Sequence, residues 1–504
     1  MNAGYVVLSQ DTRGRYDSEG EFKVFTEENT LDAEDGYDTV EWAAEQDWCT
    51  GKVGTFGASY DGWMQYELAR LRPPHLKAMS AISIPPENTG IDWPGAFKPA
   101  RRIRWWFTTI GPDIRKKQGL PKPHSSQEAV TIWNDLEQAR MLALLPLIRI
   151  VDYLPEPLAS QVDKWLRNPG AKIWRHEEAH QEIEVPNLDL TGWYDHCSGI
   201  DNFIGMRKNA GSEIARNQTR MIIGPWNHNN IGKRKQGDFD FGEDGQLDVQ
   251  EERIRWFDFW LKDDDNGIKE EPIVRYYVLG TGEWKTAETW PPPTSGQKKL
   301  YLSSSGDANT VSGSGALVDE AQDSVCDSYS YDPYNPVPTL WDPACFYNVS
   351  DRRRLDYRQD ILRYVTEALN EEIEIVGNPE FILYAASSAV DTDFFVRLID
   401  VDPKGMAMEI CYGFVRARHR NSFESEDFLS PGDVTEFRIK LGITACCFRK
   451  GHRIRVDITS SDFPNHDRNH NLGKNDLLDA EMSTAEQQVF HSSEYPSHLI
   501  LPLQ

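Results

Sequence analysis

Several features that would assign the chain to common functional classes are missing. No apolar run reaches the roughly 18 residues that a membrane-spanning helix needs, so we expect no transmembrane segment. The start of the chain leads directly into a strand-like Tyr5–Leu8 without the charged and apolar regions of a signal peptide, and we expect a cytoplasmic protein. Lys and Arg number 54 against 80 Asp and Glu, and the net charge of −26 argues against binding to nucleic acid or to an anionic membrane.

Signatures of metals and cofactors are equally sparse. The seven cysteines are odd in number and form no Cys-x-x-Cys pair, which argues against a cysteine zinc site or a disulfide framework and favours a reducing compartment. No Walker or dinucleotide-binding glycine fingerprint is present, so we expect no cofactor. The hydrophobic content of 39% is ample for packed cores, and 504 residues predict more than one domain.

The chain is organised around a serine turn. A strand-like run from Val53 to Phe56 leads into Gly57-Ala58-Ser59-Tyr60-Asp61-Gly62, and a helical pattern follows. A strand, a sharp glycine turn with a serine at its tip, and a helix are the context of a nucleophile elbow. The two glycines let strand and helix approach closely. Ser59 is therefore a candidate nucleophile, and a plain Gly/Ser loop is the alternative.

The order of strand and helix patterns predicts three kinds of domain. Residues 1–87 and 178–272 alternate strands with helices, which is typical of a parallel α/β sheet with its active groups at the carboxyl ends of strands. Residues 5–10 are read as a buried strand of that sheet. Residues 88–177 hold helical patterns rich in tryptophan and indicate a cap over an active site, and most of these tryptophans are expected to form the core of a small helical subdomain. Residues 273–504 hold short strands separated by turns, which predicts an all-β jelly roll.

Three candidate catalytic residues follow three strand-like segments in the order Ser59, Asp195, His228. A serine hydroxyl needs a base in contact with it, and histidine can accept the proton because its pKa lies near working pH. Serine, acid, histidine is also the chain order of α/β-hydrolase triads. The alternatives are Asp195 as a helix cap, His228 as a polar loop residue, and His196 as a competing base on the wrong segment for this order.

One metal motif competes with this interpretation. His176-Glu177-Glu178-Ala179-His180 matches His-Glu-x-x-His, which on a helix places two imidazoles on one face. The segment is short and charged, and no third ligand motif follows it. We expect a solvated polar turn at the end of the cap and no metal site.

Motifs along nearly the whole chain resemble the cocaine esterase and X-prolyl dipeptidyl-peptidase family of serine hydrolases. They are Gln10-Asp11-Thr12-Arg13-Gly14, Ser18-Glu19-Gly20-Glu21-Phe22, Gly57-x-Ser59-Tyr60-x-Gly62, Gly192-Trp193-Tyr194-Asp195, Gly224-Pro225-Trp226-x-His228, residues 331–339 and Gly451-His452-Arg453-Ile454-Arg455. The resemblance implies an α/β-hydrolase parallel sheet with an inserted helical cap, followed by an all-β jelly-roll domain.

The resemblance also implies a site. Ser59 would be the nucleophile, Asp195 the acid and His228 the base, and the backbone N–H of Tyr60 would donate to the oxyanion. Four residues in the cap and beside the acid and histidine motifs are expected to bind substrate, namely Trp105, Trp106, Cys197 and Trp226.

One departure from the family concerns the start of the chain. Family members usually carry strands before the equivalent of Asp11, with a tyrosine hydroxyl as the second oxyanion donor. Here Met1 stands just before the Tyr5 strand, so we expect these strands to be absent. Losing one oxyanion donor typically costs ~10²–10³ in kcat.

The expected function is a serine hydrolase that cleaves small-molecule ester or peptide bonds through an acyl-enzyme on Ser59. An X-prolyl dipeptidyl peptidase is the alternative within the same chemistry. An impaired or non-enzymatic binding protein is the alternative of another class, because of the expected missing strands. Specificity for α-amino acid esters is not supported, since no extra carboxylates gather near Asp195. A homodimer is left open beside a monomer.

Overall fold

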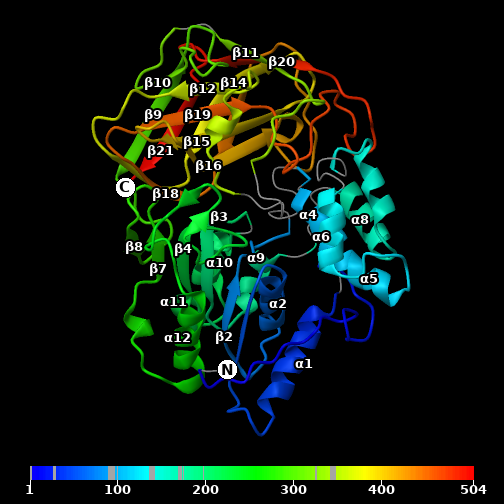
Figure 1. Cartoon of the computed structure of the whole chain (residues 1–504). Helices are drawn as coiled ribbons and strands as arrows, with labels where there is room; N and C mark the ends of the chain where they lie inside the picture. Colours follow the sequence, from blue (N-terminus) through cyan, green and yellow to red (C-terminus); the bar gives the residue numbers. More distant parts are fainter. Residues whose placement is uncertain are drawn as a thin grey trace.

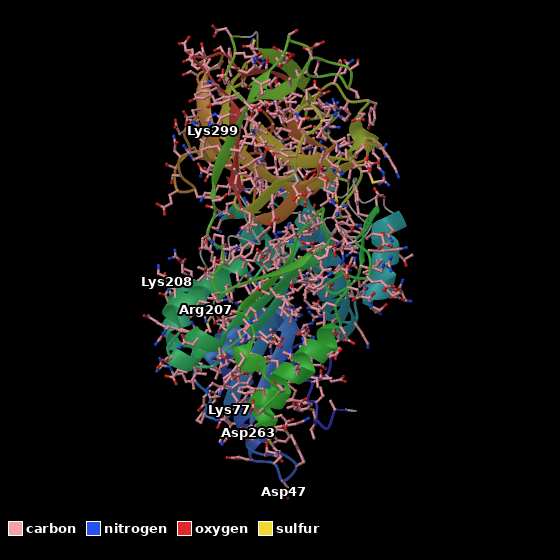
Figure 2. The ribbon with its side chains drawn as sticks, turned by 90° about the vertical axis from the view of Figure 1, so that its left-hand side faces the viewer. Asp47, Lys77, Arg207, Lys208, Asp263 and Lys299 are labelled. Carbon is pink, nitrogen blue, oxygen red and sulfur yellow. The ribbon has the colours of Figure 1, made fainter. Side chains whose placement is uncertain are left out.

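The computed structural model describes residues 3–25, 30–88, 97–98, 100–135, 142–168, 173, 175–196, 198–323, 326–340 and 348–504. A mixed sheet with flanking helices forms the lower part, short helices lie to one side, and a large body of strands forms the upper part (Figure 1). In the turned view Lys299 lies on the upper part, and Lys77, Asp263 and Asp47 lie towards the lower end (Figure 2). The domain boundaries expected near residues 88, 178 and 273 stay predictions.

The lower sheet runs in the order β1-β2-β3-β4-β7-β8, with a single parallel bridge between Met79 and Asn187 joining β2 to β3. Every pairing in it is parallel except the last, between β7 and β8. The elements of this part are α1 (Asp32–Ala44), β1 (Val53–Ala58), α2 (Tyr60–Ala69), β2 (Leu76–Ile82), β3 (Leu188–Tyr194), α10 (Ile200–Asn209), α11 (Glu213–Gln218), β4 (Arg220–Asn227), β5 (Lys235–Gln236), β6 (Phe239–Asp240), α12 (Val249–Lys262), β7 (Val274–Tyr277) and β8 (Trp284–Ala287).

Helices cover both faces of this sheet, as its strand sequences require. Strands β3 and β4 are buried along their whole length, which is typical of parallel strands covered on both faces. One face packs against α2 and α10 through Trp63, Tyr66 and Met206. The other face packs against α12 through Trp256, whose Nε1 donates to the Met79 carbonyl oxygen at 2.9 Å. The predicted α/β layers are confirmed.

The expectation of a buried strand at residues 5–10 is wrong. These residues are extended but belong to no strand, and Val6, Val7 and Leu8 are 62%, 53% and 49% exposed. The segment is held by side chains instead: Tyr5 donates to Asp258 on α12 at 2.7 Å. An apolar run becomes a buried strand only where a neighbouring strand pairs with it, and within the described residues β1 pairs with β2 alone. Accordingly β1 is the one strand of the series β1 to β4 with no buried residue.

The predicted helical region has its own apolar core. Its elements are α4 (Ala100–Trp105), a π-helical turn (Trp106–Ile110), α5 (Gly111–Lys117), α6 (Ser126–Asp135), a 3₁₀ segment (Leu147–Tyr153), α8 (Leu158–Arg167), α9 (His176–Ala179) and a 3₁₀ turn (His180–Glu182). Trp106, Trp133 and Trp165 lie in the core that these helices share. No strand occurs in the described part of residues 88–177, as the sequence predicts.

The upper part is a body of strands whose longest path runs in the order β11-β20-β14-β21-β9-β10-β12-β19-β15-β16. The pairings along this path are antiparallel except that of β10 with β12, which is parallel. Its strands are β9 (Gly296–Ser303), β10 (Ala316–Val318), β11 (Asp327–Tyr331), β12 (Leu362–Val365), β13 (Ile373–Gly377), β14 (Glu380–Ser387), β15 (Asp393–Val401), β16 (Ala407–Arg416), β17 (Thr435–Lys440), β18 (Thr444–Phe448), β19 (Arg453–Thr459), β20 (Ala485–Phe490) and β21 (His498–Leu503). Central strands such as β15 are buried on both faces, so the body is a packed core.

Side chains join the upper part to the other two. Tyr194, at the end of β3, donates its hydroxyl to the Glu409 carbonyl oxygen on β16 at 3.1 Å. Lys98 donates its backbone N–H to Asp467 at 2.7 Å. Phe97 beside it packs on Phe414, with the ring centres 5.1 Å apart. The strand body thus contacts both the end of β3 in the lower sheet and the start of the helical region. Within the described residues, no helix is long and apolar enough to cross a membrane.

Candidate active site

Ser59 occupies a strained turn between β1 and α2. Its φ of 61° and ψ of −119° lie in a region that non-glycine residues rarely adopt. The Ser59 N–H donates to the Ile82 carbonyl oxygen at 3.0 Å, which ties the turn to the end of β2. A Cβ at Gly57 would lie 2.4 Å from the Asp61 Cβ, and one at Gly62 would lie 2.7 Å from the Ile82 oxygen. The glycine spacing therefore serves a close approach of strand and helix.

Asp195 and His228 meet at the ends of two paired strands. Asp195 follows β3, His228 follows β4, and His228 Nδ1 lies 2.9 Å from Asp195 Oδ1. The Asp195 side chain is buried and the His228 side chain is 10% exposed. Asn227 shapes the histidine turn, because its Oδ1 accepts from the N–H groups of Asn229 and Asn230. The carboxylate thus holds the imidazole through Nδ1 at the edge of the sheet where Ser59 stands.

Close packing of the backbone sets this meeting point. A Cβ at Gly192 would lie 2.0 Å from the Trp226 carbonyl oxygen, so only glycine fits where β3 passes β4. Ser59 stands at the carboxyl end of β1, on the same edge of the sheet as Asp195 and His228. Within the described residues no hydrogen bond joins Ser59 Oγ to His228.

Tyr60 lies at the start of α2, where the first N–H groups of a helix have no intrahelical partner. Its hydroxyl donates to Asp32 Oδ2 at 2.9 Å, and its ring stacks on Trp105 at 6.3 Å. Phe25 packs edge-on against the same tyrosine at 5.0 Å. These contacts fix the residue that follows Ser59, so its backbone N–H is held in place.

The residues expected to bind substrate differ in their burial and in their distance along the chain from the serine turn. Trp105 is partly exposed and stacks on Tyr60, so it lies beside the serine turn. Trp106 is wholly buried against Trp165, with the ring centres 4.6 Å apart, and Trp226 is wholly buried with its Nε1 bonded to the Gly245 carbonyl oxygen at 2.8 Å. Both indoles fill cores, and their assignment to substrate stays a prediction. Cys197 lies outside the described residues.

His196 neighbours the candidate base. Its ring centre is 5.1 Å from that of His228. Burial lowers the pKa of His196 well below its usual value, and the Arg101 guanidinium lowers it further. The imidazole is therefore neutral at neutral pH. Asp195 is bonded to His228, as the triad order predicts.

Two carboxyl groups near the site were missed by the sequence reasoning. Burial raises the pKa of Asp32 to about 6, although the Tyr60 hydroxyl donates to it. Asp189 on β3 is wholly buried, and burial followed by the charge of Asp195 raises its pKa well above the usual value. The available signal was Asp189 itself, an acid inside an otherwise apolar strand.

The metal motif has a structural role. Contrary to the expected solvated turn, His176 and His180 are both fully buried. His176 Nε2 lies 3.4 Å from Glu67 on α2, and its ring stacks on Tyr66 at 4.6 Å. His180 Nε2 lies 2.8 Å from Asn202 Oδ1 on α10. His176 therefore connects its own segment to α2, and His180 connects it to α10.

Family comparisons match both halves of the chain. Residues 1–230 match the model described as X-Pro dipeptidyl-peptidase (S15 family), and residues 266–500 match the X-Pro dipeptidyl-peptidase C-terminal non-catalytic domain. Cocaine esterase from Rhodococcus sp. (strain MB1 Bresler) is 33% identical over 99% of this chain and 88% of its own length.

Solved structures show the same fold at lower identity. An aminopeptidase from a marine sediment archaeon, Thaumarchaeota archaeon, superposes with a TM-score of 0.72 at 23% identity, over 98% of this chain and 84% of its own. An α-amino acid ester hydrolase superposes with a TM-score of 0.72 at 22% identity, over 98% of this chain and 85% of its own. These structures share the α/β-hydrolase sheet followed by a β domain.

Proposed function

Because this chain belongs to the serine hydrolase family of cocaine esterase and the X-Pro dipeptidyl-peptidases (S15 family), we propose that Ser59, His228 and Asp195 are its catalytic triad. The family makes the chain an ester-cleaving serine hydrolase, with dipeptidyl-peptidase activity as the alternative. The observation that carries the residue assignment is the 2.9 Å contact between His228 and Asp195 on the edge of the sheet where Ser59 stands.

The proposed steps follow from this contact. Asp195 Oδ1 accepts from Nδ1–H of His228, which leaves the Nε2 lone pair to take the Ser59 proton as Oγ attacks the acyl carbonyl carbon. The Tyr60 backbone N–H donates to the resulting oxyanion. The imidazolium then gives its proton to the leaving alcohol or amine as the acyl bond breaks. Water, deprotonated by His228, hydrolyses the acyl-enzyme and restores Ser59.

A fluorophosphonate probe tests the nucleophile. The wild type should be labelled once, on the peptide that holds Ser59, and Ser59→Ala should not be labelled. Ser305→Ala, at an exposed serine of the strand body, is the matched control and should label as the wild type does. Equal labelling of wild type and Ser59→Ala would overturn the assignment.

The substrate class is a proposal of its own. We propose small-molecule esters as the preferred substrates, because cocaine esterase, which matches 99% of this chain at 33% identity, is named for its esterase activity. The S15 match keeps X-Pro peptides as the second candidate. Rates on nitrophenyl acyl esters and on X-Pro nitroanilides, measured with one enzyme preparation, separate the two. A larger kcat/KM for the anilides would favour the peptidase.

The cytoplasmic location and the homodimer stay predictions, which cell fractionation and light scattering would test.

A further inference from the structure

A cavity that is lined by none of the three triad residues lies where the lower sheet meets the strand body. Its volume is about 440 Å³, which is within the usual range for small-molecule sites. One wall comes from residues 239–244 and from the end of β7 with its following turn, at Tyr277 and residues 280–282. The other wall comes from β15, β16 and the turn before β19, at Asp400, Met408 and His452. A ligand here would touch both parts.

The apolar side chains that line the cavity are aromatic residues and methionines. Phe241 and Tyr277 meet edge to face with ring centres 6.2 Å apart, and the Tyr277 hydroxyl donates to the Phe241 carbonyl oxygen at 3.0 Å. Met406, which is 39% exposed, and Met408 face the cavity from the strand body. Aromatic faces attract cations, and methionine adapts to irregular apolar groups.

The charged share of the lining is acidic, with Asp240, Asp244, Asp400 and Asp402 and no lysine or arginine. Asp240 is paired with Arg234, and Asp400 with His452 Nδ1 at 2.9 Å. At the rim, the Arg449 side chain donates to the Thr281 carbonyl oxygen at 3.1 Å.

Asp244 and Asp402 form no such ion pair within the described part of the chain. Asp402 Oδ1 accepts the N–H groups of Lys404 and Met406, both at 2.8 Å. Asp244 lies close enough to Tyr277 for its charge to add to the effect of burial in raising the pKa of that phenol to about 12. The charge of Asp402 also acts on Arg353, but that guanidinium is itself paired with Asp351. The cavity therefore combines aromatic faces with two carboxylates that form no direct ion pair among the described residues.

We propose that this cavity binds a small organic ammonium ion, with its alkyl groups against Phe241, Tyr277 and Met408 and its charge balanced by Asp244 and Asp402. A neutral ligand would gain the apolar contacts alone, and an anion would be repelled by both carboxylates. A bare metal ion fits poorly, because no group of three metal-ligating side chains occurs in the described parts of the chain. The proposal does not depend on the hydrolytic chemistry.

Binding of choline to the full-length Ser59→Ala protein tests the site without turnover. Choline should bind saturably by calorimetry and raise the Tm, because it bridges the two walls. Dimethylbutanol, its uncharged carbon analogue, should bind at least about tenfold more weakly, and dimethylbutanoate should not bind. Saturable choline binding that the uncharged analogue matches would overturn the proposal, and so would the absence of saturable binding.

Variants locate the site. Asp244→Asn and Asp402→Asn should each weaken choline binding by about fivefold or more, and the second keeps the Oδ1 atom that accepts from the turn. Asp264→Asn, an exposed acid after α12, is the matched control and should bind as the parent does. Wild type blocked at the nucleophile by a fluorophosphonate should still bind choline. Loss of binding in the blocked enzyme would place choline in the active site and overturn the inference.

Discussion

His228 Nδ1 lies 2.9 Å from Asp195 Oδ1, and the two residues come from the ends of strands that pair directly in a parallel sheet. The carboxylate is buried, so it interacts with the imidazole in a medium where a charge–charge contact is stronger than in water. The same carboxylate fixes which nitrogen carries the proton. This relationship between an acid and a base has direct consequences for activity.

Asp195→Asn should lower kcat by about 10³–10⁴-fold, because an amide can hold the histidine in the wrong tautomer. KM should change much less, since the ring position is kept. Steady-state kinetics on an ester substrate measures both. Asp201→Asn, at an exposed acid six residues further on, should retain near-wild-type kcat. An Asp195→Asn enzyme within tenfold of the wild type would contradict the assignment.

Ser59→Gly should be more stable than Ser59→Ala by about 1–2 kcal/mol, although both should be inactive. The serine φ of 61° costs a residue with a Cβ conformational energy that glycine does not incur. Urea unfolding of the two variants, compared at equal m-values, measures the difference. An alanine variant as stable as the glycine variant would show that the turn relaxes and carries no strain.

Gly192→Ala should reduce kcat or abolish folding, because its Cβ would lie 2.0 Å from the Trp226 carbonyl oxygen and force β3 away from β4. The acid and the histidine would then separate. Circular dichroism distinguishes the two outcomes, and kinetics quantifies the first. Gly296→Ala, where a Cβ meets no atom within 4 Å, is the control and should behave as the wild type. Full activity of Gly192→Ala would refute the close-packing argument.

The wild type should lose stability as the pH falls from about 6.5 towards 4, in part through His180. Burial lowers the pKa of this imidazole from 6.5 to about 4, so in that window the unfolded chain binds a proton that the folded chain excludes. One such proton lowers the free energy of unfolding by about 1.4 kcal/mol for each unit by which the pH falls in that window. His180→Gln keeps a donor towards Asn202 and should flatten this slope.

The measurement for this prediction is the urea midpoint of unfolding at several pH values between 4 and 7. His75→Gln, at a histidine side chain that is 41% exposed, serves as the surface control and should keep the wild-type slope. An unchanged slope in His180→Gln would show that the acid sensitivity arises elsewhere in the chain.

Much of the site could be predicted from the sequence because its signals are local. The turn at Ser59 needs glycines at fixed spacing, and the acid and histidine follow strands whose apolar patterns are recognisable. Such features depend on steric contacts between residues that are close in sequence, so a short stretch of sequence is sufficient to predict them. The helical region and the strand body were predicted for the same reason, since turn residues and periodicity are read within a few positions.

Only the tertiary structure decided which side chains are buried, because burial depends on partners far away in the chain. Val6–Leu8 look like a buried strand, yet they are exposed where no described strand pairs with them. Trp106 and Trp226 look like pocket residues but fill cores, and His176 and His180 look exposed but join helices. The cavity between Tyr277 and Met408 joins residues more than a hundred positions apart. By itself the sequence determined the local geometry of the serine turn and the order of the catalytic groups. Long-range packing determined everything that depends on the neighbours of a side chain.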